Sequence, residues 1–243
     1  MVKKGLLAGG IIAMSLCLAS CIAPNKDIRQ VETFKSSYES INNEAKGDSG
    51  TFYREVHIAK NNPVEISNMK SVLDKINNKD SFVVFFGYAE CPWCRSMVEN
   101  MVKSAKDNKI KKIYYVDIEN ERDQLEYQPN TDSFAEVSIG SKEYKKMLKK
   151  IGNVLDKYEI EYTNADGEIK KKDTKEKRIY APSLVYIKNG KAIKMIDGLS
   201  EKQKDENETL TKEIKADMKK EMDEFFASID KGVNTCSASG EKC

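Results

Sequence analysis

Residues 82–94 read FVVFFGYAECPWC, and the prediction of the fold rests mainly on these residues. Residues 82–86 form an uninterrupted apolar run closed by Gly87, as expected of a strand that is buried on both faces. A helix begins at the cysteine motif, and its apolar residues fall on one side: Met97, Val98, Met101, Val102 and Ala105. Residues 113–118 then return as a strand. This order predicts two parallel strands joined by a right-handed crossover.

The flanking sequence adds further elements to this unit. Upstream we predict a β-like run over residues 52–58, a short strand over residues 64–66, and a helix capped by Ser67 with an apolar stripe of Val72, Leu73 and Ile76. Downstream, residues 183–187 and 192–196 predict an antiparallel hairpin around the Asn189-Gly190 turn. A terminal helix follows, with a buried stripe of Leu210, Ile214, Met218, Met222, Phe225, Phe226 and Ile229, and Gly232 is expected to end it. The chain is therefore predicted to be α/β with a central mixed sheet, folded over residues 51–231.

An insertion of about residues 120–178 is far longer than a crossover needs. It contains an amphipathic helical pattern made by Tyr144, Met147, Leu148, Ile151, Leu155 and Tyr158. A charged hairpin is expected around Asp166-Gly167, with a lysine-rich run that Glu168, Asp173 and Glu176 interrupt. We predict a largely helical insertion. The lysine run is interpreted as a solvated face, and the alternative is a patch that binds an anionic partner.

The N-terminus has the pattern of an export signal. Lys3 and Lys4 precede a short apolar stretch, residues 5–18, which is too short to span a bilayer comfortably. Residues 18–21, Leu-Ala-Ser-Cys, resemble the lipobox of bacterial lipoproteins, which implies a signal peptide over residues 1–20 and a lipid on Cys21. The alternative is a secreted protein cleaved nearby. Residues 21–50 are predicted to be a lipidated tether containing a short helix near residues 31–41, which places the protein on the extracytoplasmic face of the bacterial cell membrane.

Charge and cysteine content narrow the function. The formal charge is +2, and it becomes neutral when Lys3 and Lys4 are removed with the signal, so nothing in the composition favours nucleic acid as a partner. Disulfides persist outside the cytoplasm. Apart from Cys17 in the signal and Cys21, the cysteines form two plausible pairs, Cys91 with Cys94 and Cys236 with Cys243.

The Cys91-Pro92-Trp93-Cys94 motif suits disulfide exchange. At a helix start, unpaired N–H groups and the helix dipole favour a thiolate on the first cysteine, and the second lies one turn inside. Pro92 is tolerated in the first turn because its missing N–H is not needed there. Cys91 is thus the predicted nucleophile and Cys94 the resolving thiol. Among the neighbouring charges, we expect Arg95 to favour the Cys91 thiolate and Glu90 to oppose it.

The whole arrangement resembles the thioredoxin fold, a three-layer α/β/α structure, over about residues 52–118 and 179–230. The resemblance implies that Pro182, in Ala181-Pro182-Ser183, is a cis proline facing the redox motif, and that the Ala181 backbone binds a peptide substrate. Pro92 and Trp93 are expected to contact the same substrate. More narrowly, the lipobox and the motif resemble the bacteriocin transport accessory proteins and related thioredoxin-like lipoproteins of Gram-positive bacteria.

The sequence also departs from the thioredoxin pattern. Thioredoxins have a tryptophan and a buried aspartate where this chain has Glu90 and Phe85, so the usual proton acceptor for the resolving thiol is missing. The Pro-aromatic pair is similar to glutaredoxins, and a leading proline also occurs in the oxidant DsbA. The direction of electron flow is therefore left open between oxidase, reductase and isomerase.

Several other interpretations stay open. Cys91 and Cys94 could form a structural disulfide or half of a zinc site, although His57 is the sole histidine and we expect it to be structural or on the surface. In the tail, residues 232–243, Cys236 and Cys243 could form a stabilising disulfide, a second redox pair, or free or metal-binding thiols.

The predicted function is a monomeric, membrane-anchored thiol–disulfide oxidoreductase with no metal and no cofactor beyond its redox disulfide. Its expected partners are the thiols and disulfides of exported proteins or peptides, with a possible membrane electron donor or acceptor. The alternative is a non-catalytic binding or accessory module for a secretion or bacteriocin system, in which the insertion holds the partner.

Overall fold

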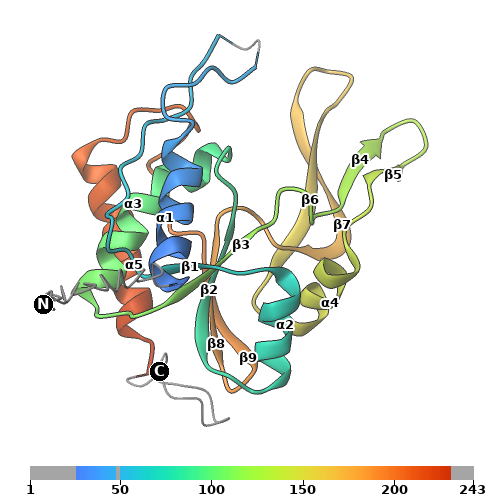
Figure 1. The fold of residues 1–243 in the computed structure, drawn as a ribbon. Helices are drawn as coiled ribbons and strands as arrows, with labels where there is room; N and C mark the ends of the chain where they lie inside the picture. Colours follow the sequence, from blue (N-terminus) through green and yellow to red (C-terminus); the bar gives the residue numbers. More distant parts are fainter. Residues whose placement is uncertain (1–25, 48–49, 231–243) are drawn as a thin grey trace, which may run out of the picture.

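The computed structural model describes residues 26–47 and 50–230, and within them the central sheet has five strands in the order β1-β3-β2-β8-β9 (Figure 1). Strands β1, β3 and β2 are parallel, β8 is antiparallel to β2, and β9 is antiparallel to β8. The strands are β1 (Val64–Ile66), β2 (Phe82–Gly87), β3 (Ile113–Asp117), β8 (Ser183–Lys188) and β9 (Lys191–Ile196). The expected mixed sheet, the parallel β2–β3 pair and the β8–β9 hairpin are all confirmed.

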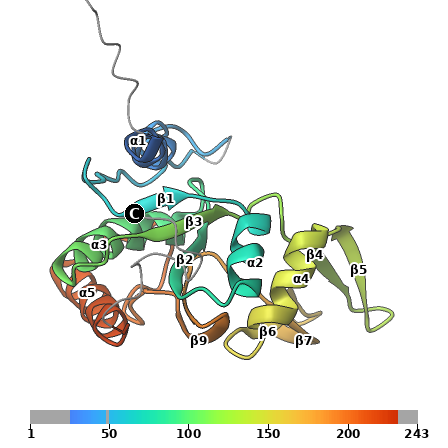
Figure 2. The same cartoon turned by 60° about the horizontal axis from the view of Figure 1, so that its bottom comes forward.

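Helices cover both faces of this sheet (Figures 1 and 2). One apolar cluster joins α1 (Lys26–Glu39), α3 (Pro92–Asp107) and α5 (Lys212–Ala227) to Val83 and Phe85 of β2. The other joins α2 (Met69–Asn77) and α4 (Lys142–Ile151) to Val84 and Phe86. Alternate residues of β2 thus enter opposite clusters, and every residue of the strand is buried. The apolar run has no polar face because the strand has no solvent side.

Helix α1 corrects the expectation of a tether up to residue 50. It lies beside β1 (Figure 2), and its Phe34 and Tyr38 side chains are 0% exposed. Their rings pack against the Tyr115 ring of β3, with centroids 4.9 Å and 6.1 Å away respectively. Two aromatic residues four positions apart share one helix face, so α1 belongs to the folded domain. The predicted short helix is present, but it is no part of a spacer.

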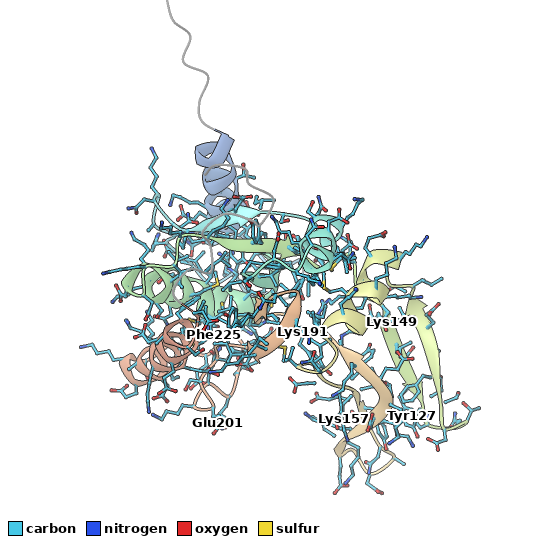
Figure 3. All side chains as sticks on the ribbon, turned by 90° about the horizontal axis from the view of Figure 1, so that it is seen from below. Tyr127, Lys149, Lys157, Lys191, Glu201 and Phe225 are labelled. Atoms are coloured by element: carbon cyan, nitrogen blue, oxygen red, sulfur yellow. The ribbon has the colours of Figure 1, made fainter. Side chains whose placement is uncertain are left out.

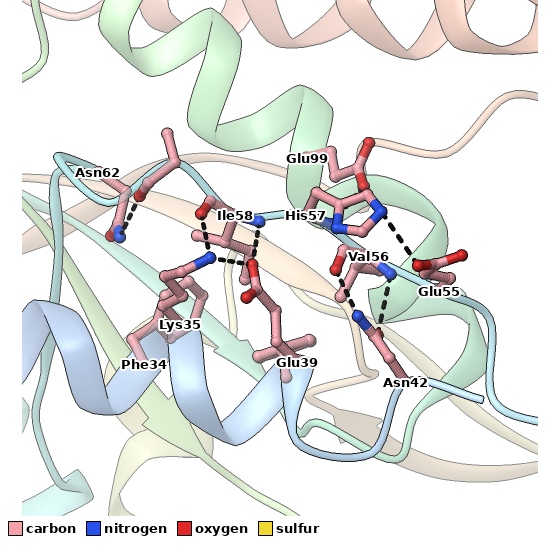
Figure 4. Close-up of polar contacts among 12 residues, drawn as sticks. Phe34, Lys35, Glu39, Asn42, Glu55, Val56, His57, Ile58, Asn62 and Glu99 are labelled. Atoms are coloured by element: carbon pink, nitrogen blue, oxygen red, sulfur yellow. Dashed lines mark hydrogen bonds and ion pairs between the residues drawn. The ribbon is translucent and has the colours of Figure 1, made fainter. Parts of the chain in front are cut away.

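The β-like run over residues 52–58 is not a strand of the sheet. Val56 and Ile58 are buried, as the alternating pattern indicates, but apart from an isolated bridge at Phe52 the described residues form no ladder there. Side chains satisfy the backbone instead (Figure 4). Asn42 donates to Val56 O at 2.8 Å and accepts from Val56 N at 3.0 Å, while Glu39 accepts from Ile58 N at 2.6 Å. The residues that end α1 therefore take the place of a neighbouring strand.

The insertion contains more strand than helix, so the prediction of a largely helical insertion is wrong. Its described elements are α4 and the strands β4 (Gln124–Gln128), β5 (Ser133–Ser138), β6 (Asp156–Thr163) and β7 (Ile169–Arg178). The strands form two antiparallel hairpins that project from the body, and Tyr127 and Lys157 mark them in Figure 3. The expected turn is present at Gly167, with φ +80°. The helical pattern fails because α4 ends at Ile151, and Tyr158 lies in β6.

The boundaries of α2 and α5 also differ from those predicted. Asn68 caps α2 in place of Ser67, and its side chain accepts a hydrogen bond from Ser71 N at 2.9 Å. Leu210 precedes α5, whose N-cap is Thr211, and Ile229 follows the C-cap Ser228. Gly232, the predicted end signal, lies outside the described residues. No helix among residues 26–47 and 50–230 is both long and apolar enough to cross a membrane.

Candidate active site

The cysteine motif lies where β2 gives way to α3. Cys91 is the N-cap of α3, Pro92 is the first helical residue, and Cys94 follows within the first turn. The Cys94 backbone N–H donates to Cys91 Sγ at 3.2 Å, so the sulfur occupies the position that an N-cap oxygen usually fills. Both are free thiols. The predicted placement of the motif at a helix start is confirmed.

The structure brings Ala181 and Pro182 to this motif from the other side of the insertion. The Ala181–Pro182 peptide bond is cis, as the resemblance implied. The Cys91 thiol donates to the Ala181 carbonyl oxygen at 3.4 Å. That contact puts the residue before the cis proline directly beside the first cysteine, and Ser183 then begins β8.

The two thiols have opposite pKa shifts. A hydrogen bond from Cys94 lowers the pKa of Cys91 most, and the backbone N–H groups of Cys94 and Trp93 and the charge of Arg122 lower it further against the effect of burial. Burial raises the pKa of Cys94 well above its ordinary value, and the hydrogen bond and charge of Cys91 add to this. Cys91 is therefore the first of the two thiols to ionise, as expected of a nucleophile whose resolving thiol keeps its proton.

Arg95 does not act as the sequence suggested. It is 1% exposed, and its guanidinium donates to the carbonyl oxygens of Arg54, Tyr38 and Ala89 at 2.6, 2.8 and 3.1 Å. It also donates to Asn42 Oδ1 at 2.6 Å. Arg95 thus ties the end of α1 to the loop before Cys91. Its guanidinium lies on the α1 side of α3, where these acceptors hold it.

Arg122 supplies a positive charge at the thiols, and sequence reasoning missed it. It follows β3 at the start of the insertion, and its guanidinium lies 5.1 Å from the centroid of the Tyr88 ring, in the loop before Cys91. Its charge lowers the pKa of both Cys91 and Cys94. No local motif marks Arg122, since only the meeting of β2 and β3 brings residue 122 to residue 91.

Position 87 has no room for a side chain, because the Phe85 ring and Cys94 Sγ lie close to the Gly87 backbone. A Cβ built there would lie 2.7 Å from Phe85 Cζ and 3.0 Å from Cys94 Sγ, so a larger residue would displace one of them. Phe85 is 0% exposed and is apolar, as the departure from the thioredoxin pattern indicated. Position 85, close to Cys94, therefore carries an aromatic ring and no carboxylate that could accept a proton from Cys94.

The remaining residues singled out from the sequence differ in exposure. Pro92 and Trp93 are partly exposed, and Trp93 packs against the α1/α3/α5 cluster. The side chain of His57 is 74% exposed and forms an ion pair with Glu55 at 3.2 Å, as Figure 4 shows, which fits the surface role expected of it.

For the remaining cysteines, only the sequence-based predictions apply. Cys21, Cys236 and Cys243 lie outside the described residues, and so do the predicted signal peptide and the C-terminal tail. Over the described part of the chain, no three His, Cys, Asp or Glu side chains are grouped so that they could hold a metal ion.

Comparison with known proteins gives no identification. No protein-family model matches the chain, and no curated protein matches its sequence significantly.

Proposed function

We propose that this chain is a thiol–disulfide oxidoreductase with a thioredoxin-like fold that acts on exported proteins or peptides. One observation carries the proposal: Cys91 at a helix N-terminus has a lowered pKa, and its sulfur lies 3.4 Å from the carbonyl before a cis proline. The mixed sheet with helices on both faces supports the proposed fold. A purely structural disulfide would not need a cysteine with a lowered pKa.

The reaction uses two thiol exchanges. The Cys91 thiolate attacks a substrate disulfide, an S–S bond forms between Cys91 and one substrate sulfur, and the other substrate sulfur leaves as a thiolate. Cys94 then loses its proton and attacks Cys91 Sγ, which releases the second substrate thiolate. The substrate gains two electrons, and the Cys91–Cys94 pair becomes a disulfide. The same steps in reverse oxidise a substrate dithiol, and a membrane partner would restore the pair.

The proposed location is the outer face of the bacterial cell membrane, with a lipid on Cys21. The folded domain begins at α1, whose first residue is Lys26. A lipid on Cys21 would therefore hold the domain close to the membrane surface, where newly exported chains emerge. The proposed narrower relationship, to the bacteriocin transport accessory proteins, rests on the lipobox and the active-site motif.

A binding or accessory module is the second candidate, because the hairpins of the insertion expose apolar side chains. Val137, Ile139 and Ile169 are 56%, 72% and 73% exposed. These residues could hold a partner without any chemistry at Cys91. The two candidates differ in what an alanine at Cys91 does: the binding function survives it, and the oxidoreductase function does not.

The decisive experiment measures disulfide exchange in the full chain with a disulfide-linked peptide as substrate. We expect Cys91→Ser to abolish peptide reduction, and Cys94→Ser to trap a covalent peptide adduct that mass spectrometry detects. A variant with Cys236→Ser and Cys243→Ser is the control, because it removes only thiols outside the motif and should keep full activity. Peptide reduction that persists in Cys91→Ser would contradict the proposal.

The direction of electron flow is a separate measurement. The Cys91–Cys94 pair is equilibrated with a dithiol buffer and followed through the fluorescence of Trp93, the sole tryptophan, beside the pair. A potential near about −120 mV indicates an oxidant, and one near about −270 mV indicates a reductant.

A further inference from the structure

In the second exchange step, Cys94 must lose its proton although its thiol is buried. Its thiol is 0% exposed, and burial raises its pKa well above the ordinary value. Only the thiolate attacks a disulfide, so Cys94 must lose a proton inside the protein. Once Cys91 is bonded to substrate it no longer carries the negative charge that could accept this proton. The Phe85 ring beneath the pair has no group that accepts it either.

Two tyrosine hydroxyls lie buried on the same side of the sheet. Tyr38 comes from α1 and Tyr115 from β3, and their side chains are 0% and 3% exposed. Their ring centroids lie 6.1 Å apart. Neither hydroxyl makes a well-formed hydrogen bond to any residue that the structure describes, although each is near enough to affect the pKa of the other. Buried hydroxyls without partners are rare in folded proteins, and a functional role is one explanation.

Strand register connects these hydroxyls to Cys94 and to a carboxylate. Tyr115 lies opposite Phe85, with ring centroids 5.5 Å apart, and Asp117 lies opposite Gly87, over which Cys94 Sγ sits. Because side chains two residues apart point to the same face of a strand, Tyr115 and Asp117 both project toward the face that holds Cys94. Asp117 is at the end of β3 and reaches solvent.

The electrostatic effects agree with this placement. Burial raises the pKa of Tyr38 most, and the nearby Cys94 raises it further. Burial likewise raises the pKa of Tyr115, followed by the charges of Asp117 and Cys94. Tyr115 is therefore close enough to both Asp117 and Cys94 for each to change its pKa. Burial also raises the pKa of the Asp117 carboxyl, with a further rise from Glu90, while a backbone hydrogen bond from Glu119 opposes it.

We propose that the Tyr38 and Tyr115 hydroxyls pass a proton between the Cys94 thiol and the Asp117 carboxylate during the second exchange step. The inference rests on the proposed oxidoreductase function. As the Cys94–Cys91 S–S bond forms, the Cys94 proton moves through the hydroxyls to Asp117 and from there to water. The Cys91–substrate S–S bond breaks, and its electron pair leaves on the substrate thiolate. In the oxidising direction the same path returns a proton to Cys94.

The surrounding titratable groups come from three elements or loops. Cys91 and Glu90 lie at the start of α3 and in the loop before it, and Tyr88 opens that loop. Glu119 and Arg122 follow β3, and the charge of Arg122 lowers the pKa of Asp117 and of both thiols. The three proposed groups are positioning residues, since none of them touches the substrate.

The experiment separates the two exchange steps with a chromogenic aromatic disulfide. The full chain is used with Cys17, Cys21, Cys236 and Cys243 replaced by serine, so that only Cys91 and Cys94 react. The first burst of coloured thiolate reports attack by Cys91, and the second reports attack by Cys94 on the mixed disulfide. We expect Tyr38→Phe, Tyr115→Phe and Asp117→Asn each to slow the second burst roughly tenfold and to move its pH midpoint up by about one unit. The first burst stays unchanged.

Tyr114→Phe is the matched control, since it removes a hydroxyl from the neighbouring position on the other face of β3, and both bursts should be unaffected. A purely electrostatic role of Asp117 gives the opposite sign, because removal of a negative charge near Cys94 would lower the pKa of that thiol and speed the second burst. An unchanged or faster second burst in any of the three variants overturns the proposal, and so does equal slowing of both bursts. Absence of both bursts in the unsubstituted pair would instead refute the oxidoreductase function itself.

Discussion

At the scale of single residues, two arginines that look alike in the sequence have different tasks. Arg95 follows the motif directly, yet its guanidinium is used up in holding three backbone carbonyls and Asn42. Arg122 is remote in sequence, and its charge acts on both thiols. Closeness in sequence therefore indicated the wrong arginine as the one whose charge lowers the pKa of Cys91. Substitutions that change one arginine at a time should separate stability from reactivity.

Arg122→Gln should raise the pKa of Cys91 and reduce its reactivity. The lowered pKa of Cys91 stabilises the reduced folded protein above the pKa of the unfolded thiol, and this stabilisation is lost as pH falls through the folded value. Without the Arg122 charge, the pH midpoint for alkylation of Cys91 by iodoacetamide should move up by roughly half a unit to one unit. The pair should also become less oxidising, because its thiolate form is less stable. Arg122→Lys is the control that keeps the charge, and a midpoint shared by Gln and wild type would rule this role out.

Arg95→Met should destabilise the fold with little effect on the pKa of Cys91. The substitution leaves the carbonyls of Tyr38, Ala89 and Arg54 without their donor in a buried place. Loss of hydrogen bonds that involve a buried charged group costs about 3 kcal/mol or more of unfolding free energy. Urea unfolding measures it, and alkylation of Cys91 serves as the second readout. A loss below about 1 kcal/mol would show that these carbonyls find other donors.

At the scale of elements, most helices and strands could be predicted from the sequence, but their boundaries could not. The six residues of β2 are all buried, and the apolar run predicted this without help from any neighbour. The run over residues 52–58 has an alternating pattern that also indicates a strand, but Asn42 and Glu39 satisfy its backbone, which no local pattern reveals. The helix in the insertion was extended too far, because Leu155 and Tyr158 continue the spacing although Leu155 precedes β6 and Tyr158 lies in it.

Helix α1 offers a direct test of whether the N-terminal segment is part of the domain. Phe34→Ala removes a ring that is 0% exposed and lies 4.9 Å from the Tyr115 ring. Large-to-small changes of this kind cost about 3–5 kcal/mol. Ser36→Ala, on the exposed side of the same helix, should stay within about 0.5 kcal/mol of wild type in the same urea titration. Equal stability of the two variants would restore the interpretation of this segment as a tether.

At the scale of the whole molecule, the site depends on contacts that cross the sequence. Cys91 and Cys94 were found from their motif, and Pro182 from its resemblance to a known pattern. Tyr38 comes from α1, Tyr115 and Asp117 come from β3, and Arg122 follows β3, so only the fold brings them to Cys94 and no local pattern in the sequence marks them. The positions of Tyr115 and Asp117 follow from the parallel pairing of β2 and β3, which sets Tyr115 against Phe85 and Asp117 against Gly87.

The same architecture predicts uneven stability across the molecule. Strand β2 lies in the middle of the sheet with helices on both faces, so its amides should exchange hydrogen only through global unfolding. The β4–β5 and β6–β7 hairpins are two-stranded sheets whose side chains are mostly exposed, and such pairs have little stability of their own. Hydrogen exchange followed by mass spectrometry should therefore show slow exchange in β2 and exchange at least about a hundredfold faster in β5 and β7, as opening that costs about 3 kcal/mol less implies. The β8–β9 hairpin is the internal control. It is also an antiparallel pair of consecutive strands, but it lies in the central sheet and should exchange slowly. Hairpins as protected as β2 would mean that the insertion folds as part of the core and does not merely project from it.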